Sequence, residues 1–145
     1  MSPERNRVRV DIRVVIDPAT FDLSDHGSIL GVIYLAGESW RFPDDRWSDF
    51  PVVILRWWLL ELASEDRAEL LFMDGPFAAL LSGDRLTLTD GEKAVAEYSV
   101  DPLSLRAAVT DAAERVLGIA VERKWITRDV DELRRCLGRL TPGPK

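Results

Sequence analysis

The chain has 145 residues, of which 25 are acidic and 19 basic, so its net charge at neutral pH is −6. An apolar fraction of 46% is ordinary for a folded protein and excludes disorder over most of the chain. The single cysteine, Cys136, excludes an internal disulfide framework and a cysteine-rich zinc site. The acidity disfavours a nucleic-acid partner, because binding to phosphate depends on lysine and arginine.

The two ends of the chain and its longest apolar run indicate where the protein acts. The N-terminus is polar and lacks the apolar stretch of a signal peptide. The longest apolar run, residues 52–60, is too short to span a bilayer. We therefore expect a cytoplasmic protein that forms one domain over residues 1–145, with a frayed tail at 140–145.

Negative charge is concentrated in the middle of the sequence. Residues 38–101 contain 14 acidic and 6 basic side chains, a net charge of −8. An acidic surface can attract a basic protein, although acidity can also serve solubility alone. The charge pattern thus favours a protein partner over a nucleic acid.

The N-terminal region has the alternation expected of a sheet. Apolar residues recur at every second position from Val8 to Ile16, which predicts a half-buried antiparallel strand. Residues 17–27 are rich in Asp, Ser, Pro and Gly and read as a loop. A second strand is predicted from Ser28 to Ala36, with a short third strand over residues 39–42.

A helix is predicted next. Ser48 or Asp49 is its expected N-cap, Pro51 fits its first turn, and it should end near Ala63. Its interior is apolar on nearly every side, so it should be buried or covered by a partner. Arg56 interrupts this interior and must either reach water or pair with an acid, for which Asp74 is one candidate.

Short apolar runs separated by glycine-containing turns predict a four-strand meander. The runs are residues 69–73, 77–81, 85–89 and 94–100. Asp-Gly between such runs is typical of a hairpin turn. Asp101 followed by Pro102 predicts a second helix that runs to about Lys124. Thr127 or Asp129 should cap a third helix, whose apolar stripe comprises Val130, Leu133, Leu137 and Leu140.

These elements predict an α+β fold. The antiparallel sheet should contain the N-terminal strands plus the four-strand meander, with the central helix and the two C-terminal helices packed on one face.

Chemistry-bearing motifs are scarce. His26 is the only histidine, and the nearby sequence Gly27–Gly31 resembles a nucleophile elbow only superficially. His26 and Ser28 are alternate residues of one extended segment, which rarely gives the hydrogen bond that a serine hydrolase needs. No phosphate-binding loop or metal-ligand spacing is present. We expect no catalytic activity, no cofactor and no metal.

Tryptophan and arginine cluster between residues 40 and 58, and these are the residue types enriched in interface hot spots. The leading hypothesis is a protein-binding surface, although the tryptophans could instead belong to the core. The predicted partner-binding residues are Trp40, Asp44, Asp45, Trp47 and Asp49.

Two other hypotheses follow from the same region. A sheet covered by helices can leave an apolar pocket for a small molecule. The residues that could line such a pocket are Arg56, Trp57, Trp58, Phe72, Asp74 and Phe77. Alternatively, the chain forms a homodimer through the central helix or the edge of the meander.

The segments Trp47–Trp58 and Phe72–Phe77 resemble small uncharacterised bacterial proteins of the actinomycete type. Some of these are similar in size and acidity to polymorphic-toxin immunity proteins. The resemblance implies a protein that binds one toxin and blocks it by occlusion, and it supplies no catalytic residues.

Overall fold

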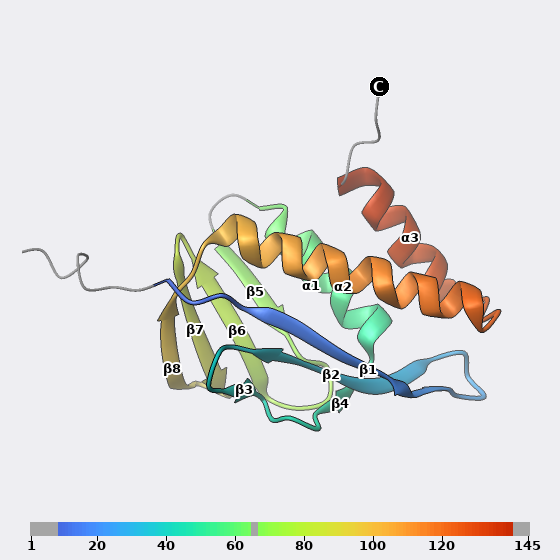
Figure 1. Ribbon diagram of the computed structural model, residues 1–145, viewed down its shortest axis with the longest axis horizontal. Coiled ribbons are helices and arrows are strands. Elements are labelled where there is room, and N and C mark those ends of the chain that lie inside the picture. Colours follow the sequence, from blue (N-terminus) through green and yellow to red (C-terminus); the bar gives the residue numbers. More distant parts are fainter. Residues whose placement is uncertain (1–8, 65–66, 141–145) are drawn as a thin grey trace, which may run out of the picture.

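The computed structural model describes residues 9–64 and 67–140. It has an α+β fold with antiparallel strands, as predicted (Figure 1). The elements in chain order are β1 (Arg13–Leu23), β2 (Ile29–Ala36), β3 (Arg41–Phe42), β4 (Ser48–Asp49), α1 (Pro51–Leu62), β5 (Arg67–Leu71), β6 (Phe77–Ser82), β7 (Arg85–Asp90), β8 (Lys93–Ser99), α2 (Pro102–Glu122) and α3 (Arg128–Leu140).

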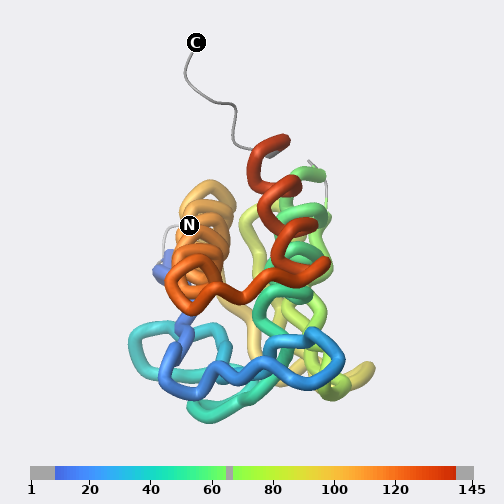
Figure 2. The backbone as a smooth tube through the Cα atoms, turned by 90° about the vertical axis from the view of Figure 1, so that its right-hand side faces the viewer, coloured from blue at the N-terminus to red at the C-terminus, as the bar shows by residue number. Residues whose placement is uncertain are grey.

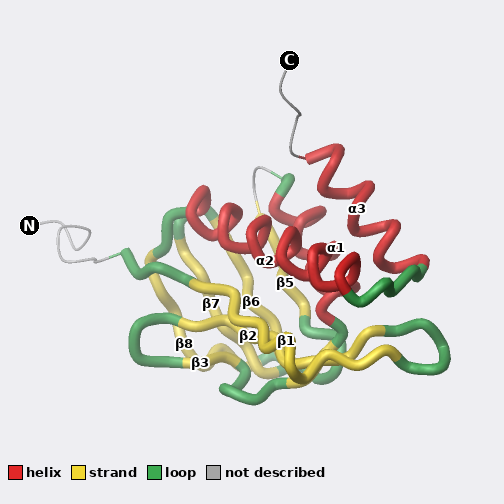
Figure 3. Tube along the Cα trace, turned by 45° about the vertical axis from the view of Figure 1, so that its right-hand side comes forward, coloured by secondary structure: helices red, strands yellow, loops and turns green. Residues whose placement is uncertain are grey.

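The strands divide between two four-stranded sheets, whereas the sequence predicted one sheet containing the N-terminal strands and the meander. In the N-terminal sheet, β2 lies between β1 on one side and the short strands β3 and β4 on the other. The meander sheet has the order β5-β6-β7-β8, which confirms the predicted meander. Its tight turns contain Gly83 and Gly91, both in the left-handed backbone region that glycine adopts without strain. Figure 3 shows the three helices grouped on one side of the strands.

Strand β1 differs from the prediction at both ends. It begins at Arg13, and residues 9–12 are not part of the ladder, while Val8 lies outside the described residues. The loop predicted for residues 17–27 is confirmed only for residues 24–27, because β1 continues past Pro18 to Leu23. The register with β2 shifts between Asp17 and Asp22, and this irregularity accommodates the proline.

Helix α1 begins at Pro51 and is capped by Phe50 without a side-chain hydrogen bond. The predicted caps, Ser48 and Asp49, are wrong because both residues pair with β2 as strand β4. The helix packs against β2, β5, α2 and α3, so most of its apolar surface is covered by elements of the same chain. Figure 2 shows the helices above the strands of the N-terminal sheet.

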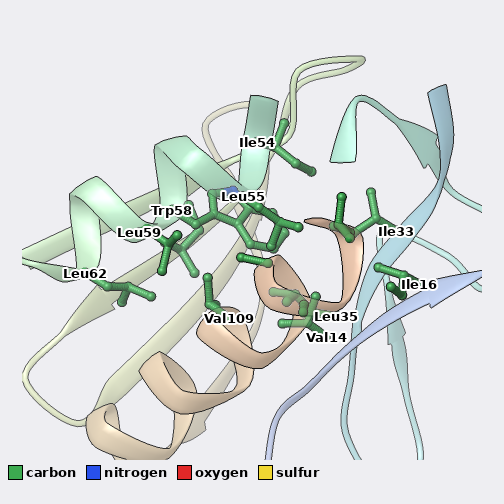
Figure 4. Packing of buried hydrophobic residues seen from close by; sticks show 14 of the residues in the cluster. Val14, Ile16, Ile33, Leu35, Ile54, Leu55, Trp58, Leu59, Leu62 and Val109 are labelled. Carbon is green, nitrogen blue, oxygen red and sulfur yellow. The ribbon is translucent and has the colours of Figure 1, made fainter. Parts of the chain in front are cut away.

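One cluster of buried side chains draws members from both sheets and all three helices. Figure 4 shows Leu55 and Trp58 of α1 beside Leu35 of β2 and Val109 of α2. Trp58 is 0% exposed, and its indole N–H donates a hydrogen bond to the carbonyl oxygen of Leu71 over 2.8 Å. The indole therefore fills the core without leaving its polar atom unpaired.

The two C-terminal helices begin where the sequence predicts. The Asp101 carboxylate accepts from the backbone N–H of Leu103 over 3.1 Å, and the Thr127 hydroxyl accepts from Val130 over 3.1 Å. Three members of the predicted apolar stripe of α3, Val130, Leu133 and Leu137, are buried. Apart from Leu140, the predicted frayed tail lies outside the described residues. No helix in residues 9–64 and 67–140 has both the length and the apolar character required to cross a membrane.

The burial of α1 predicts a strong contrast between two leucines on the same helix. Leu55 is 0% exposed, whereas Leu60 is 49% exposed. Replacing Leu55 by Ala should lower the free energy of unfolding by about 2–5 kcal/mol, because it leaves a cavity in the core. Leu60→Ala is the matched control and should change it by less than about 1 kcal/mol. Urea unfolding of both variants measures the difference, and equal losses would contradict the assigned orientation of α1.

Candidate functional site

Three connections between strands meet at one end of the molecule. They are residues 43–47 between β3 and β4, residues 72–76 between β5 and β6, and residues 90–93 at the turn between β7 and β8, and we call them the acidic tip (Figure 1, lower edge). The backbone N–H of Gly91 donates to the carbonyl oxygen of Pro76 over 2.9 Å. The backbone N–H of Asp74 donates to the carboxylate of Asp49 over 3.1 Å. Hydrogen bonds thus hold all three connections together.

The Asp49 carboxylate is the centre of this arrangement and is 0% exposed. Its Oδ1 accepts from the N–H of Phe50 over 2.7 Å. Its Oδ2 accepts from the indole N–H of Trp47 over 2.9 Å and from the N–H of Asp74. A buried carboxylate is stable only when such donors replace water. Asp49 therefore joins the β5–β6 turn to the start of α1, and its burial leaves no exposed surface for the predicted partner contact.

Trp47 forms the aromatic base of the tip. Its half-buried ring lies edge-to-face with Phe77 at 5.1 Å and with Phe72 at 6.3 Å between ring centroids. It also lies against Gly75, where a side chain would clash with the indole. This packing fixes the loop between β3 and β4 to the meander sheet.

Trp40 connects the two sheets at a second point. Its half-buried indole stacks on the ring of Tyr98 in β8, with centroids 4.7 Å apart and planes 13° from parallel. The indole also lies against Gly37, where a side chain would clash with it. Trp40 and Trp47 therefore stabilise the fold, and each is still partly accessible.

The exposed charges of the tip are mainly negative. Among the described residues, none of its five exposed carboxylates forms an ion pair; they belong to Asp44, Asp45, Asp74, Asp90 and Glu92. The same segments contain two basic residues, Arg46 and Lys93. The tip is thus a hydrogen-bonded acidic surface around a partly exposed indole.

Sequence reasoning identified Asp44 and Asp45 but missed Asp90 and Glu92 as members of this surface. The signal was available, because alternate turns of an antiparallel meander lie at the same end of the sheet. The turn at Asp74 and the turn at Asp90 had therefore to be neighbours. Only the arrival of the β3–β4 loop at that end required the structure.

The six residues predicted for an aromatic pocket have different surroundings. Trp58 and Phe72 are buried in the core, and Phe77 packs against Trp47. Trp57 is half-buried beside a shallow hollow between α1 and β5. Asp74 is exposed at the acidic tip, whereas Arg56 faces α3. Trp58 and Phe72 therefore fill the interior, and the six residues do not line one common pocket.

A second concave surface, the arginine groove, lies between α1 and α3. It has a volume of about 460 Å³ and is lined by Arg56, Leu60, Glu132, Arg135, Cys136 and Arg139. Nη2 of Arg56 lies 3.4 Å from Oε2 of Glu132, which corrects the suggested pairing with Asp74. The turn of α1 directs Arg56 toward α3, whereas Asp74 lies near the start of the helix.

The arginine groove has an excess of positive charge. Glu132 also contacts Arg128 at 3.4 Å, so one carboxylate serves two arginines. Among the described residues, Arg135 and Arg139 have no acidic side chain within ion-pair distance. Burial raises the pKa of the Cys136 thiol above its ordinary value, although Arg139 and Arg56 partly oppose this. Cys136 is therefore a neutral thiol at neutral pH and a poor nucleophile.

The remaining reactive groups are scattered. His26 is exposed in the turn between β1 and β2, where its backbone N–H donates to the Ser24 hydroxyl. The backbone N–H of Ser28 donates to the same hydroxyl. Within residues 9–64 and 67–140, no three His, Cys, Asp or Glu side chains are grouped so as to hold a metal ion.

Comparison of this chain with protein-family models, curated proteins and solved structures finds no match.

The hydrogen bonds of Asp49 predict a specific cost for replacing its carboxylate. In the Asp49→Asn variant, an amide N–H₂ would replace one of the two carboxylate oxygens. The backbone or indole N–H groups that donate to that oxygen in the native protein would lose their acceptor. The free energy of unfolding should fall by about 1–3 kcal/mol, the usual cost of leaving buried donors unsatisfied. Asp45→Asn, a change of the same chemistry at an exposed position, is the control. Equal effects of the two changes on urea unfolding would contradict the role assigned to Asp49.

Proposed function

We propose that this chain is a protein-binding domain whose acidic tip binds a basic partner. The observation that carries the proposal is the convergence of five exposed, unpaired carboxylates around a partly exposed indole. Backbone hydrogen bonds and aromatic packing already hold the three connections in place. Binding would therefore order little of the chain, which lowers its entropic cost.

Each component of the tip has a physical role in such a complex. Unpaired carboxylates attract a basic surface over several ångströms and speed the encounter. Partly exposed Trp47 offers a large rigid surface of the type that dominates interface energies. Trp40 lies outside the tip, because it stacks on Tyr98 at the end of β8 opposite the 90–93 turn. Arg46 provides one positive charge among the acidic side chains. A partner that places a positive charge opposite Arg46 would bind less well, so this arginine adds specificity.

We further propose that the partner is a toxin and that the chain is an immunity-type inhibitor acting in the cytoplasm. This reading rests on the resemblance of Trp47–Trp58 and Phe72–Phe77 to small bacterial proteins and on the acidity of the tip. An inhibitor of this kind acts by occlusion and needs no catalytic residues. Co-expression with the product of the neighbouring gene provides a direct assay, because an inhibitor should relieve that product's toxicity.

The acidic tip predicts how charge removal should affect binding. The tip variant neutralises four carboxylates of the tip. Its substitutions are Asp44→Asn, Asp45→Asn, Asp90→Asn and Glu92→Gln. The partner is captured from cells of the source, purified, and titrated calorimetrically against both forms of the protein. The tip variant should raise the Kd by about 100-fold, since each lost surface ion pair is worth up to about 1 kcal/mol.

The control variant removes four exposed negative charges outside the tip. Its substitutions are Asp22→Asn, Glu69→Gln, Glu114→Gln and Glu122→Gln. It should leave the Kd within about threefold of the original value, because these residues lie outside the tip. A partner bound equally well by the tip variant, or the absence of any stoichiometric partner, would refute the proposed function.

A second candidate function is the binding of a small anion in the arginine groove. The specific observation is that Arg135 and Arg139 face this groove without an acidic partner among the described residues. Arginine recognises carboxylate and phosphate groups through paired hydrogen bonds. Such a ligand would bind between α1 and α3. This site differs from the apolar, aromatic pocket that the sequence suggested.

Thermal unfolding in the presence of inorganic phosphate or citrate tests this candidate. At about ten times its Kd, a bound anion should raise the Tm by about 4 °C. The double variant Arg135→Gln/Arg139→Gln should lose the increase, whereas Arg41→Gln/Arg46→Gln should keep it. Sodium chloride at equal ionic strength controls for general salt effects. An increase that is the same in both double variants would exclude the groove as its source.

A further inference from the structure

Strand β1 is an edge strand of the N-terminal sheet, and its open side can be identified from the hydrogen bonds of β2. The N–H of Ile33 donates to the carbonyl oxygen of Trp47, so this residue of β2 faces β4. Directions alternate along an antiparallel strand, so the neighbouring β2 residues face β1. They pair with Arg13, Val15 and Asp17. The backbone groups of Val14 and Ile16 therefore point away from the sheet.

The same open side is closed at both of its ends. Before β1, the N–H of Val10 donates to the carbonyl oxygen of Ser99 over 2.8 Å. Further along, the Arg123 guanidinium at the end of α2 donates to the carbonyl oxygen of Pro18 over 2.9 Å. Between these two points, the structure describes no hydrogen-bond partner for the outward N–H and C=O groups of Val14 and Ile16. An unpaired edge of this kind is a template for another strand.

A groove of about 390 Å³ runs along this open stretch. One wall is formed by residues 12–16, and the other by Ala108, Asp111 and Arg115 of α2. These three helical residues are spaced so that they share one face of α2. Figures 1 and 3 show α2 running beside β1 over this stretch. The groove therefore combines a free strand edge with a pair of opposite charges on a helix.

We infer that the occupant of this groove is the β1 edge of a second copy of the chain, so that the two N-terminal sheets join across a two-fold axis. The side chains of Arg13, Val15 and Asp17 share one face of β1. In antiparallel pairing centred on Val15, each Arg13 lies opposite Asp17 of the other copy. A register centred on Arg13 would place the Arg13 side chains of the two copies opposite each other. A register centred on Val14 would place Asp11 of each copy opposite Asp17 of the other. The Val15-centred register is the one that matches opposite charges.

The helical wall has the same self-complementarity. A two-fold axis that passes through Val15 brings the two α2 helices together in opposite directions. Asp111 and Arg115 both line the groove and lie one turn apart on α2. A two-fold axis that crosses the helix between them places Asp111 of each copy opposite Arg115 of the other. Two layers of the molecule thus carry reciprocal charge pairs about one axis, which is the property of an isologous interface. The acidic tip takes no part in this contact.

Sedimentation equilibrium of the full chain from about 1 to about 200 µM should detect a dimer of twice the 16.4 kDa chain mass. Arg13→Asp should raise the dimer Kd by about tenfold or more, because two attractive pairs become repulsive. The exchanged variant Arg13→Asp/Asp17→Arg should restore the original Kd, which a merely structural role of Arg13 would not explain. Asp22→Arg on β1 and Glu114→Arg on α2 are the controls and should not change the Kd.

Amide exchange followed by NMR provides a second readout at the interface itself. The N–H groups of Val14 and Ile16 should become more protected as the protein concentration rises, whereas those of β8 should not. A chain that stays monomeric at the highest concentration would overturn the inference and leave the groove for an extended peptide. A dimer whose Kd is unaffected by Arg13→Asp would also overturn it, because its interface would lie elsewhere.

Discussion

Helix α1 is apolar on almost every side, and no single neighbour can cover such a helix. The rest of the fold meets most of this requirement: β2 and β5 pack on it from the two sheets, α2 and α3 pack on other sides, and Leu60 stays about half exposed, at 49%. Its N-terminus is held by the hydrogen bonds of Asp49, and its one interior charge, Arg56, is paired with Glu132 of α3. The acidic tip and the arginine groove both adjoin this helix. Asp49, just before its N-terminus, is hydrogen-bonded to Asp74 of the tip, and the groove lies between the helix and α3.

The tryptophans between residues 40 and 58 differ in how far they are exposed, so they cannot all have the same role. Trp58 serves the core alone, and Trp47 and Trp40 attach loops to the meander sheet while keeping part of each indole accessible. Trp47 thus fixes the position of the acidic tip, whereas Trp40 attaches its loop near the opposite end of β8. A protein-binding role needs this division, because a partner recognises side chains that the fold has already fixed in place.

Local rules predicted what depends on neighbouring residues. The meander followed from its glycine turns, and α2 followed from Asp101 and Pro102, since these residues act within their own turn. Sequence reasoning failed where distant pairing overrides local preference. Pro18 marked a loop, yet pairing with β2 carries the strand past it. Asp49 fitted a helix cap, but its pairing with β2 turned the carboxylate toward a distant turn. For the site, Asp44 and Asp45 were foreseen, whereas the partner of Arg56 could not be.

The contact between Arg123 and Pro18 joins residues that are 105 positions apart. During synthesis, the hairpin of β1 and β2 leaves the ribosome long before the helix that covers it. The inner face of its β1 strand, which includes Val14 and Ile16, packs on α2 and has no permanent cover until that helix has been made. The nascent chain must therefore pass through a stage with an exposed apolar hairpin, which is the stage at which chaperones and aggregation compete for a protein.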